Sequence, residues 1–268
     1  MTVILPHAVL PHASAATLLP SERHPAARPV PPAPLSPELS KLLARLPVQD
    51  DAEALRKSLF HAGTHFNPDL LTSEAERRAR LEGVHAALDR AESLVFLDTE
   101  STGGRNGRLI EVGLVETDVE QNITGGLHFR CNPHRRSQAR ARRVHGIQDC
   151  ELEHCPEFAA RADELLEAVR GKIVVIHDRT MDLLWLNREL QATRPGAPRF
   201  EDCCTVIDSF VLARAVPSER RRNGLDALLE WYGLGARGGH HDAYGDAALL
   251  SRVFFELWWD LDEWLYGE

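Results

Sequence analysis

Two acidic residues, Asp98 and Glu100, lie two positions apart directly after an apolar run at residues 94–97. Such a run is typical of a central strand that is buried on both faces. Side chains at positions i and i+2 of a strand point to the same side, so both carboxylates are expected at one spot. Neighbouring carboxylates repel unless a cation lies between them, and oxygen ligands of this kind suit Mg²⁺ or Mn²⁺. Taken alone, the pair is more often a solvated strand end than a metal site.

A second acidic element follows another short apolar run, at residues 173–176. His177 comes directly after this run, and Asp182 is expected on the first turn of the helix that begins nearby. An acid in that place can also do no more than stabilise the N-terminus of the helix. The pattern alone therefore leaves both a catalytic and a structural role open for Asp182.

A third element enters the last long helix. Two histidines, His240 and His241, follow a glycine-rich stretch, and Asp246 comes five residues after the second histidine. By itself this could be a surface loop and an acid at a helix N-terminus. All three elements, however, fall at the end of a strand or the start of a helix, where α/β sheets tend to build sites.

The order and spacing of these elements resemble the DnaQ-like 3′→5′ exonucleases of the DEDDh type, typified by the proofreading subunit of bacterial DNA polymerase III. The family pattern DxET(T)G is similar to residues 98–103, its histidine with an aspartate five residues later to residues 177–182, and its HxAxxD to residues 241–246. Residues 144–147 resemble the family's VHGI segment, and residues 223–228 its N(S/G)LDAL helix start. The HxAxxD spacing selects His241, not His240, as the catalytic histidine.

The resemblance implies an active site with two divalent cations, Mg²⁺ or Mn²⁺. The implied metal ligands are four carboxylates: Asp98, Glu100, Asp182 and Asp246. His241 is implied as the general base, a role that suits its near-neutral pKa. The implied substrate-binding residues surround the metal site: Thr99, Ser101, Thr102, Gly103, His145 and His177. The implied reaction releases nucleoside 5′-monophosphates from DNA 3′ ends, with single-stranded DNA favoured.

One departure from the family pattern keeps other functions open. The segment Asp178-Arg179-Thr180 stands where the family usually has a small stretch such as Asn-Ala. An extra acid and an arginine beside the metal site could change the substrate or weaken activity. The alternatives are an exoribonuclease of the same family and a catalytically weak module that binds nucleic acid or serves as a scaffold.

Hairpin-connected strands followed by an alternation of strands and helices predict an α/β fold with a mixed sheet. The resemblance implies that this sheet is RNase H-like and flanked by helices, and a small helical appendage is expected at the N-terminus. Residues 1–36 are rich in Pro and Ala and are expected to be a disordered leader. Residues 37–92 are expected to form the appendage, including a helix from Ser73 to about residue 91, and residues 93–268 the exonuclease domain. Within that domain we expect a three-stranded meander and a further strand, at residues 94–97, 108–116, 123–131 and 173–176. Helices are expected at residues 157–169, 181–191, 207–215, 225–232 and 245–264.

Charge and composition limit the partners. A net charge of −9 argues against binding nucleic acid by overall charge. Two local clusters could follow the phosphates instead: Arg135, Arg136, Arg140, Arg142 and Arg143 in one, and Arg220, Arg221 and Arg222 in the other. Trp259 and Trp264 lie off the apolar stripe of the last helix and could serve a homodimer or a repair or replication partner. Five cysteines without framework spacing are expected to be reduced thiols in a cytoplasmic protein, and no apolar run is long enough to predict a membrane span.

Overall fold

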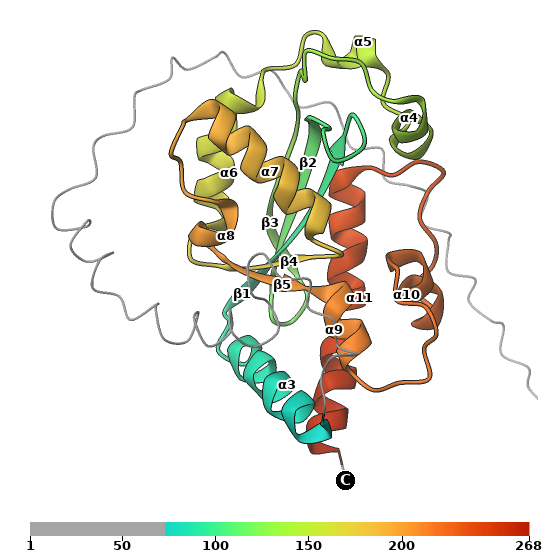
Figure 1. Ribbon diagram of the computed structural model, residues 1–268. Helices are drawn as coiled ribbons and strands as arrows, with labels where there is room; N and C mark the ends of the chain where they lie inside the picture. The colour runs from blue at the N-terminus through green and yellow to red at the C-terminus, as the bar shows by residue number, and fades with distance from the viewer. Residues whose placement is uncertain (1–72, 268) are drawn as a thin grey trace, which may run out of the picture. The chain divides into compact units, whose positions relative to one another are not determined.

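The computed structural model describes residues 73–267, and the predicted leader and the first part of the appendage lie outside these residues. A five-stranded mixed sheet forms the centre of the described part (Figure 1). Its strands are β1 (Ser93–Ser101), β2 (Leu109–Asp118), β3 (Ile123–Arg130), β4 (Ile173–Ile176) and β5 (Thr205–Asp208), in the order β3-β2-β1-β4-β5. β1, β2 and β3 are antiparallel neighbours, as the predicted meander requires, while β4 and β5 run parallel to β1.

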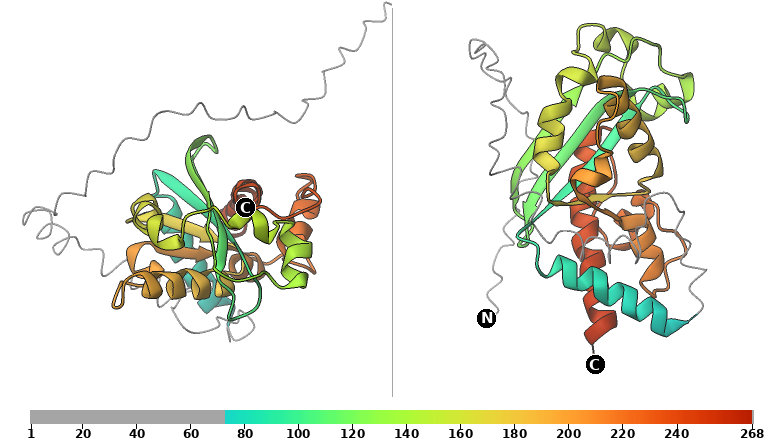
Figure 2. Two further views of the ribbon diagram at one scale, coloured as in Figure 1. Left: turned by 90° about the horizontal axis from the view of Figure 1, so that it is seen from above. Right: turned by 60° about the vertical axis from the view of Figure 1, so that its left-hand side comes forward.

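Helices cover both faces of this sheet (Figure 2). The helical segments are α3 (Glu74–Leu88), α4 (Ala139–His145), α5 (Asp149–Leu152), the 3₁₀ turn η2 (Phe158–Ala160), α6 (Ala162–Val169), α7 (Thr180–Thr193), α8 (Phe200–Cys203), α9 (Ser209–Ala215), α10 (Leu225–Trp231) and α11 (Ala243–Tyr266). The described architecture therefore confirms the predicted α/β class with its mixed sheet.

One prediction about the sheet was wrong. Residues 207–215 were expected to form a single helix, but Val206 and Ile207 belong to β5, which pairs with β4. Asp208 ends that strand, and its carboxylate accepts hydrogen bonds from the backbone N–H groups of Phe210 and Val211. Such a cap fixes the first turn of a helix, so α9 begins at Ser209.

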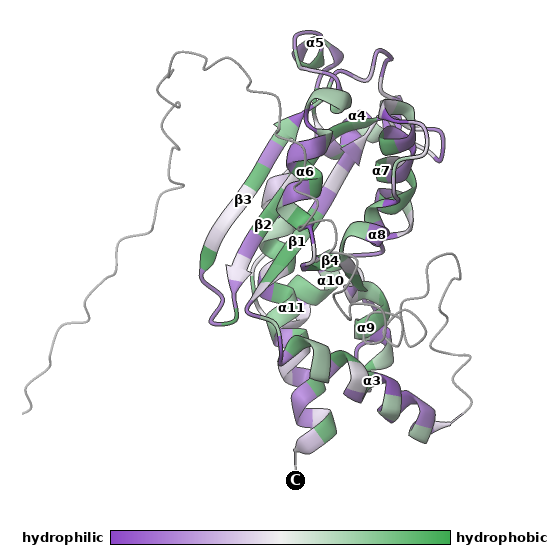
Figure 3. Ribbon diagram, turned by 90° about the vertical axis from the view of Figure 1, so that its left-hand side faces the viewer, coloured by the Kyte–Doolittle hydropathy of each residue, from purple (hydrophilic) through white to green (hydrophobic). Residues whose placement is uncertain are grey.

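Strand β1 is buried on both faces, because successive side chains point to opposite sides of the sheet. Leu94 and Phe96 pack in a core with α3, α9, α10 and α11, whereas Val95 and Leu97 pack in a second core with α6 and α7. In Figure 3 the central part of β1 is hydrophobic, while the helices around the sheet carry both hydrophobic and hydrophilic residues. This two-sided packing holds the end of β1, where Asp98 and Glu100 lie, in a fixed position.

The long helix α11 packs across β1 and β2 with the predicted apolar stripe. Phe254, Leu257, Leu261 and Leu265 are buried in the core on that side of the sheet. Trp264 is partly buried with the guanidinium of Arg78 over its ring, whereas Trp259 remains 72% exposed.

Helix α3, the described part of the predicted appendage, begins after Ser73, whose hydroxyl accepts a hydrogen bond from the N–H of Glu76. Leu81, Val84 and Leu88 of α3 belong to the same core as α11. The helix meets α11 near its C-terminal end, where His85 contacts Asp262 (Figure 1). In residues 73–267, no helix combines the length and the apolar character that crossing a membrane requires.

Candidate active site

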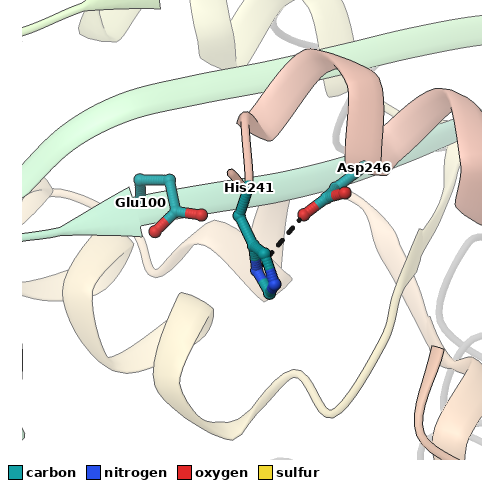
Figure 4. A group of neighbouring side chains, drawn as sticks. All are labelled: Glu100, His241 and Asp246. Atoms are coloured by element: carbon teal, nitrogen blue, oxygen red, sulfur yellow. Dashed lines mark ion pairs between the residues drawn. The ribbon is translucent and has the colours of Figure 1, made fainter. Parts of the chain in front are cut away.

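Three predicted site residues from different elements come together at the end of β1. Glu100 lies on β1, His241 lies in the segment before α11, and Asp246 lies on the first turns of that helix (Figure 4). One potential ligand atom from each residue lies within 4.8 Å of the other two. His241 Nδ1 is 3.5 Å from Asp246 Oδ2. The structure thus joins the first and third sequence elements.

Asp98 and Asp182 are the other two predicted carboxylates, and both are near this group. Asp98 precedes Glu100 by two positions on β1, so both side chains leave the same side of the strand. Asp182 is buried on α7, and its Oδ1 accepts a 2.6 Å hydrogen bond from the hydroxyl of Thr99. That bond ties the first turns of α7 to β1 and joins the second sequence element to the first.

Burial and mutual repulsion raise the pKa values of these carboxylates. Burial, followed by the charges of Asp182, Glu100 and Asp246, holds the pKa of Asp98 well above its ordinary value. Burial, followed by the charges of Asp246, Glu111 and Asp182, raises the pKa of Glu100 to about 8. Burial raises the pKa of Asp182 to about 7 even though Thr99 donates to it. Burial also raises the pKa of Asp246. Without a cation, the protein therefore holds protons on part of this group at neutral pH.

Arg237 provides positive charge inside the site, and the sequence analysis missed it. Its Nη1 donates to Asp246 Oδ2 at 2.7 Å and lies 2.9 Å from His241 Nδ1. Its Nε forms a 2.7 Å ion pair with Asp226 of α10. The arginine also lowers the pKa values of Asp98 and Glu100, against the larger effect of burial. Nothing in the sequence distinguishes this arginine, because its partners are brought to it only by folding.

The N-terminus of α11 packs directly against β2, a contact that the sequence patterns did not predict. Gly113 of β2 lies so close that an added Cβ would stand 2.1 Å from the carbonyl carbon of Ala243. Two positions away, the fully buried Glu111 accepts a 3.0 Å hydrogen bond from the N–H of Ala243. His128 and Arg130 of β3 also donate to Glu111, and these bonds lower its pKa to about 2 despite burial. These contacts between β2 and Ala243 fix the position of the helix that carries Asp246.

The structure distinguishes the two adjacent histidines. The N–H of His241 donates to the carbonyl of Val144 at 3.0 Å, which anchors the residue beside α4. His240 instead places its ring against Gly146, at the C-terminus of α4, and does not join the acidic group. Burial and the charge of Arg237 lower the pKa of His241, so its imidazole is neutral at pH 7 and can accept a proton.

The hydroxyl groups predicted to bind substrate are used largely to shape the first motif. Ser101 Oγ accepts from the N–H of Gly103, and Thr102 Oγ1 accepts from the N–H of Arg108. Gly103 has a φ of +99°, a conformation that favours glycine. Together with Thr99, these residues position the strand end, and substrate contacts by residues 99–103 stay a prediction.

The two predicted substrate-binding histidines have different surroundings. His145 is buried, and its Nδ1 accepts from the N–H of Ile147 at 3.0 Å, which places the proton of the neutral ring on Nε2. That Nε2 is buried without a hydrogen-bond partner in residues 73–267 and can serve a ligand. His177 contacts Ser209 Oγ through Nδ1 and packs against Phe210, and burial lowers its pKa to about 4. His177 therefore lies against α9 and is not one of the three residues that meet at Glu100.

Two of the unusual residues at 178–180 are linked to the end of β5. Asp178 has a φ of +57°, and its N–H donates to Asp208 at the end of β5. The side chain of Arg179 is 12% exposed, and its Nε lies 3.8 Å from the other carboxylate oxygen of Asp208. The departure from the family pattern thus forms a link between the ends of β4 and β5.

The prediction that Arg220, Arg221 and Arg222 contact substrate phosphates is wrong for Arg220. Arg220 has a side-chain exposure of 1%, and its guanidinium pairs with Asp260 of α11 and the hydroxyl of Tyr232. Because this buried guanidinium is already held by Asp260 and Tyr232, Arg220 has a structural role. In the other cluster, Arg142 pairs with Asp149, whereas Arg136, Arg140 and Arg143 are exposed.

The chemistry of the donor set fits divalent metal ions. Asp98, Glu100, Asp182 and Asp246 offer carboxylate oxygens, the ligands that Mg²⁺ and Mn²⁺ prefer. Their raised pKa values show that the protein alone does not supply enough positive charge to keep all four ionised. In the part of the chain that the structure describes, the five cysteines form no disulfide, and none belongs to a group that could hold a metal.

Comparison with known proteins extends the match beyond these residues. The RNase T exonuclease family model matches residues 95–254, which span all three motifs and more than half of the chain. The chain belongs to this exonuclease family. DNA polymerase III subunit epsilon of Rickettsia conorii is 36% identical over 168 residues, covering 61% of this chain and 72% of that protein. The same subunit from Escherichia coli K12 is 33% identical over 172 residues, covering 61% of this chain and 70% of that protein. These relatives confirm the resemblance to the DnaQ-like exonucleases, and the chain is an exonuclease.

Solved structures support the fold. Exonuclease I of E. coli, solved with a dT13 oligonucleotide, matches with a TM-score of 0.52 at 18% identity. The match covers 64% of the present chain and 41% of the Exonuclease I chain. This match supports the predicted fold, a mixed sheet flanked by helices as in known exonucleases.

Proposed function

We propose that the protein removes nucleotides from the 3′ end of DNA by metal-dependent hydrolysis and releases nucleoside 5′-monophosphates. The observation that carries this proposal is the convergence of Glu100, His241 and Asp246 within 4.8 Å, beside Asp98 and Asp182. The relatives named as DNA polymerase III subunit epsilon favour DNA as substrate. The dT13 oligonucleotide in the matching Exonuclease I structure favours single strands.

In this mechanism the four carboxylates hold two divalent cations, Mg²⁺ or Mn²⁺: Asp98, Glu100, Asp182 and Asp246. When bound, such cations lower the pKa of a water molecule and neutralise charge on the departing 3′ oxygen. His241 takes the proton from the attacking water through a ring nitrogen that carries no proton at neutral pH, because its pKa is lowered. The backbone bond from His241 to Val144 keeps the imidazole beside the site during this transfer.

Other residues of the site bind and orient the substrate. His145 Nε2–H is a donor without a partner among the described residues, and it binds an oxygen of the terminal nucleotide. The exposed arginines at and near α4, Arg136, Arg140 and Arg143, follow the upstream phosphates. This local basic surface offsets the net negative charge of the chain.

The test uses oligonucleotides labelled at either end, with Mg²⁺ or Mn²⁺. A 3′ label is expected to appear as mononucleotide in the first turnovers, and a 5′ label in a ladder of shortening products. His241→Ala is expected to reduce turnover by about 10²- to 10⁴-fold, the usual contribution of a general base. His240→Ala is the matched control, because that histidine lies against Gly146 and outside the acidic group.

Near-normal digestion by His241→Ala would refute the assignment of the base. Equal loss in both histidine variants would mean that the loop, not the imidazole of His241, is at fault. Parallel assays with single-stranded DNA, a duplex with a mismatched 3′ end and RNA identify the substrate class. Faster digestion of RNA would replace the DNA proposal with an exoribonuclease, and binding without metal-dependent release would indicate a scaffold.

A further inference from the structure

Arg237 makes contacts that an arginine in a surface loop does not ordinarily make. Its side chain is 15% exposed, and one nitrogen, Nη1, contacts both Asp246 and His241. In the proposed mechanism Asp246 binds metal and His241 accepts a proton from water. The guanidinium therefore occupies the very oxygen and nitrogen that the reaction needs.

A guanidinium and a divalent cation compete for the same carboxylate charge. Arg237 Nη1 lies 2.7 Å from Asp246 Oδ2, the same oxygen that lies 3.5 Å from His241 Nδ1. A metal ion at this site would neutralise the same carboxylate with twice the charge. The two cations would also repel each other at such short range, so a bound metal and Arg237 in its present place are mutually unfavourable.

The loop that carries Arg237 allows this side chain to move away from the acidic group. Its ends are fixed by two backbone bonds, from Leu234 N–H to Leu229 and from His241 N–H to Val144. Between these points, Gly235 has a φ of +97°, and a Cβ added at Gly238 or Gly239 would meet nothing within 4 Å. Glycines on both sides of Arg237 let the backbone rotate without moving the anchored ends.

Asp226 of α10 supplies a second partner for the arginine outside the acidic group. Its side chain is 72% exposed and lies 2.7 Å from Arg237 Nε, whereas Nη1 reaches inward to Asp246. One guanidinium thus bridges an exposed carboxylate and a buried one. If the inner contact breaks, the outer contact keeps Arg237 at the rim of the site.

We propose that Arg237 is a built-in counter-ion that holds the metal-free site in an inactive arrangement and is displaced toward Asp226 when a divalent cation binds. This inference rests on the proposed metal-dependent function. The arginine keeps the carboxylates compatible with the fold before metal arrives, and it engages His241 until then. Its cost is a weaker apparent affinity for metal, because each binding event must first break the contact with Asp246.

The test measures Mn²⁺ binding to the full chain by titration calorimetry, without nucleic acid. Arg237→Gln is expected to lower the Kd for Mn²⁺ about tenfold, the equivalent of about 1.4 kcal/mol, which is a modest value for the loss of one charge-assisted hydrogen bond. Arg222→Gln is the matched control, since it removes the same charge from an exposed pair with Glu230. Arg237→Lys, which keeps a charge but cannot bridge two carboxylates at once, is expected to give an intermediate Kd.

A second readout separates competition from a purely structural role. Metal-free Arg237→Gln is expected to melt below the wild type, because the carboxylates lose their counter-ion. Saturating Mn²⁺ is expected to bring the two Tm values together, since the metal then supplies the charge in both proteins. A structural role would lower the Tm in both states.

Wild-type or weaker Mn²⁺ binding by Arg237→Gln would overturn the counter-ion proposal, and so would a Tm deficit that persists with metal. The proposed function fails in a different way. If the wild type binds no Mn²⁺, or if Asp98→Ala leaves its binding unchanged, the metal site itself is refuted whatever Arg237 does.

Discussion

Metal binding to this exonuclease is expected to release protons, and the number released is expected to depend on pH. Burial and neighbouring charges raise the pKa of Glu100 to about 8 and that of Asp182 to about 7. Carboxylates must lose their protons to become metal ligands. At pH 7 these two groups together carry about one and a half protons, and at pH 9 they carry about one-tenth of a proton, by simple titration.

The pKa values of Glu100 and Asp182 also determine how the affinity for metal depends on pH. Since protons and metal compete for these oxygens, the apparent affinity for Mg²⁺ is expected to rise about twentyfold between pH 7 and pH 9. The raised pKa of Asp98 acts in the same direction. The folding stability of the metal-free protein is expected to fall over the same direction of pH change. Glu100 keeps its proton in the native state up to about pH 8, whereas in the unfolded chain it loses the proton near its ordinary pKa of 4.5. Stability is therefore lost as pH rises from about 4.5 to about 8.

Titration calorimetry in buffers of different ionisation enthalpy counts the protons directly. The slope of observed enthalpy against buffer ionisation enthalpy is expected to be larger at pH 7 than at pH 9, because Glu100 and Asp182 together release one to two protons near pH 7 and almost none at pH 9. Glu100→Gln should reduce the count at pH 7 by about one, because its amide carries no titratable proton. Glu153→Gln changes an exposed carboxylate and should leave the count unaltered. Equal proton release at both pH values, or none at pH 7, would refute the electrostatic account of the site.

Two further substitutions test how the fold holds the site. Gly113→Ala would place a Cβ 2.1 Å from the backbone of Ala243, so α11 must shift, and nuclease activity is expected to fall about 10²-fold. Gly125→Ala is the control, because its added Cβ meets only the side chain of Glu116, at 3.4 Å. Equal activity of the two variants would refute the inference that the contact between Gly113 and Ala243 positions α11. Arg220→Ala is expected to lower the free energy of unfolding by about 2–3 kcal/mol in urea, because it leaves Asp260 without its buried partner. A change below about 0.5 kcal/mol, the usual size for an exposed surface site, would show that this pair is not structural.

Local patterns in the sequence predicted the centre of the site. A strand buried on both faces produces a continuous apolar run, and this pattern located β1 and β4 without knowledge of their neighbours. The apolar stripe of α11 is equally local, because every third or fourth residue faces the sheet. The motif residues stand at the ends of these elements, so their meeting followed from the fold class.

Features that depend on distant contacts could not be predicted in this way. The edge strand β5 is only four residues long and runs directly into α9, so its apolar residues looked like the start of the helix. Arg220 and its neighbours Arg221 and Arg222 looked equivalent in sequence, but only Arg220 reaches Asp260, forty residues away. Arg237 was overlooked for the same reason, since Asp226 and Asp246 meet it only after α10 and α11 have packed.

The structure also moves the question of substrate choice to different residues. The segment at 178–180 departs from the family pattern, yet the side chain of Arg179 is mostly buried and directed to Asp208. A guanidinium held there ties β4 to β5 and is poorly placed to select between DNA and RNA. Selection is therefore expected to depend on groups that can still bind a ligand, among them His145 Nε2 and the exposed arginines around α4. Because α4 also anchors His241 through Val144, a substrate bound along α4 would act directly on the position of the general base.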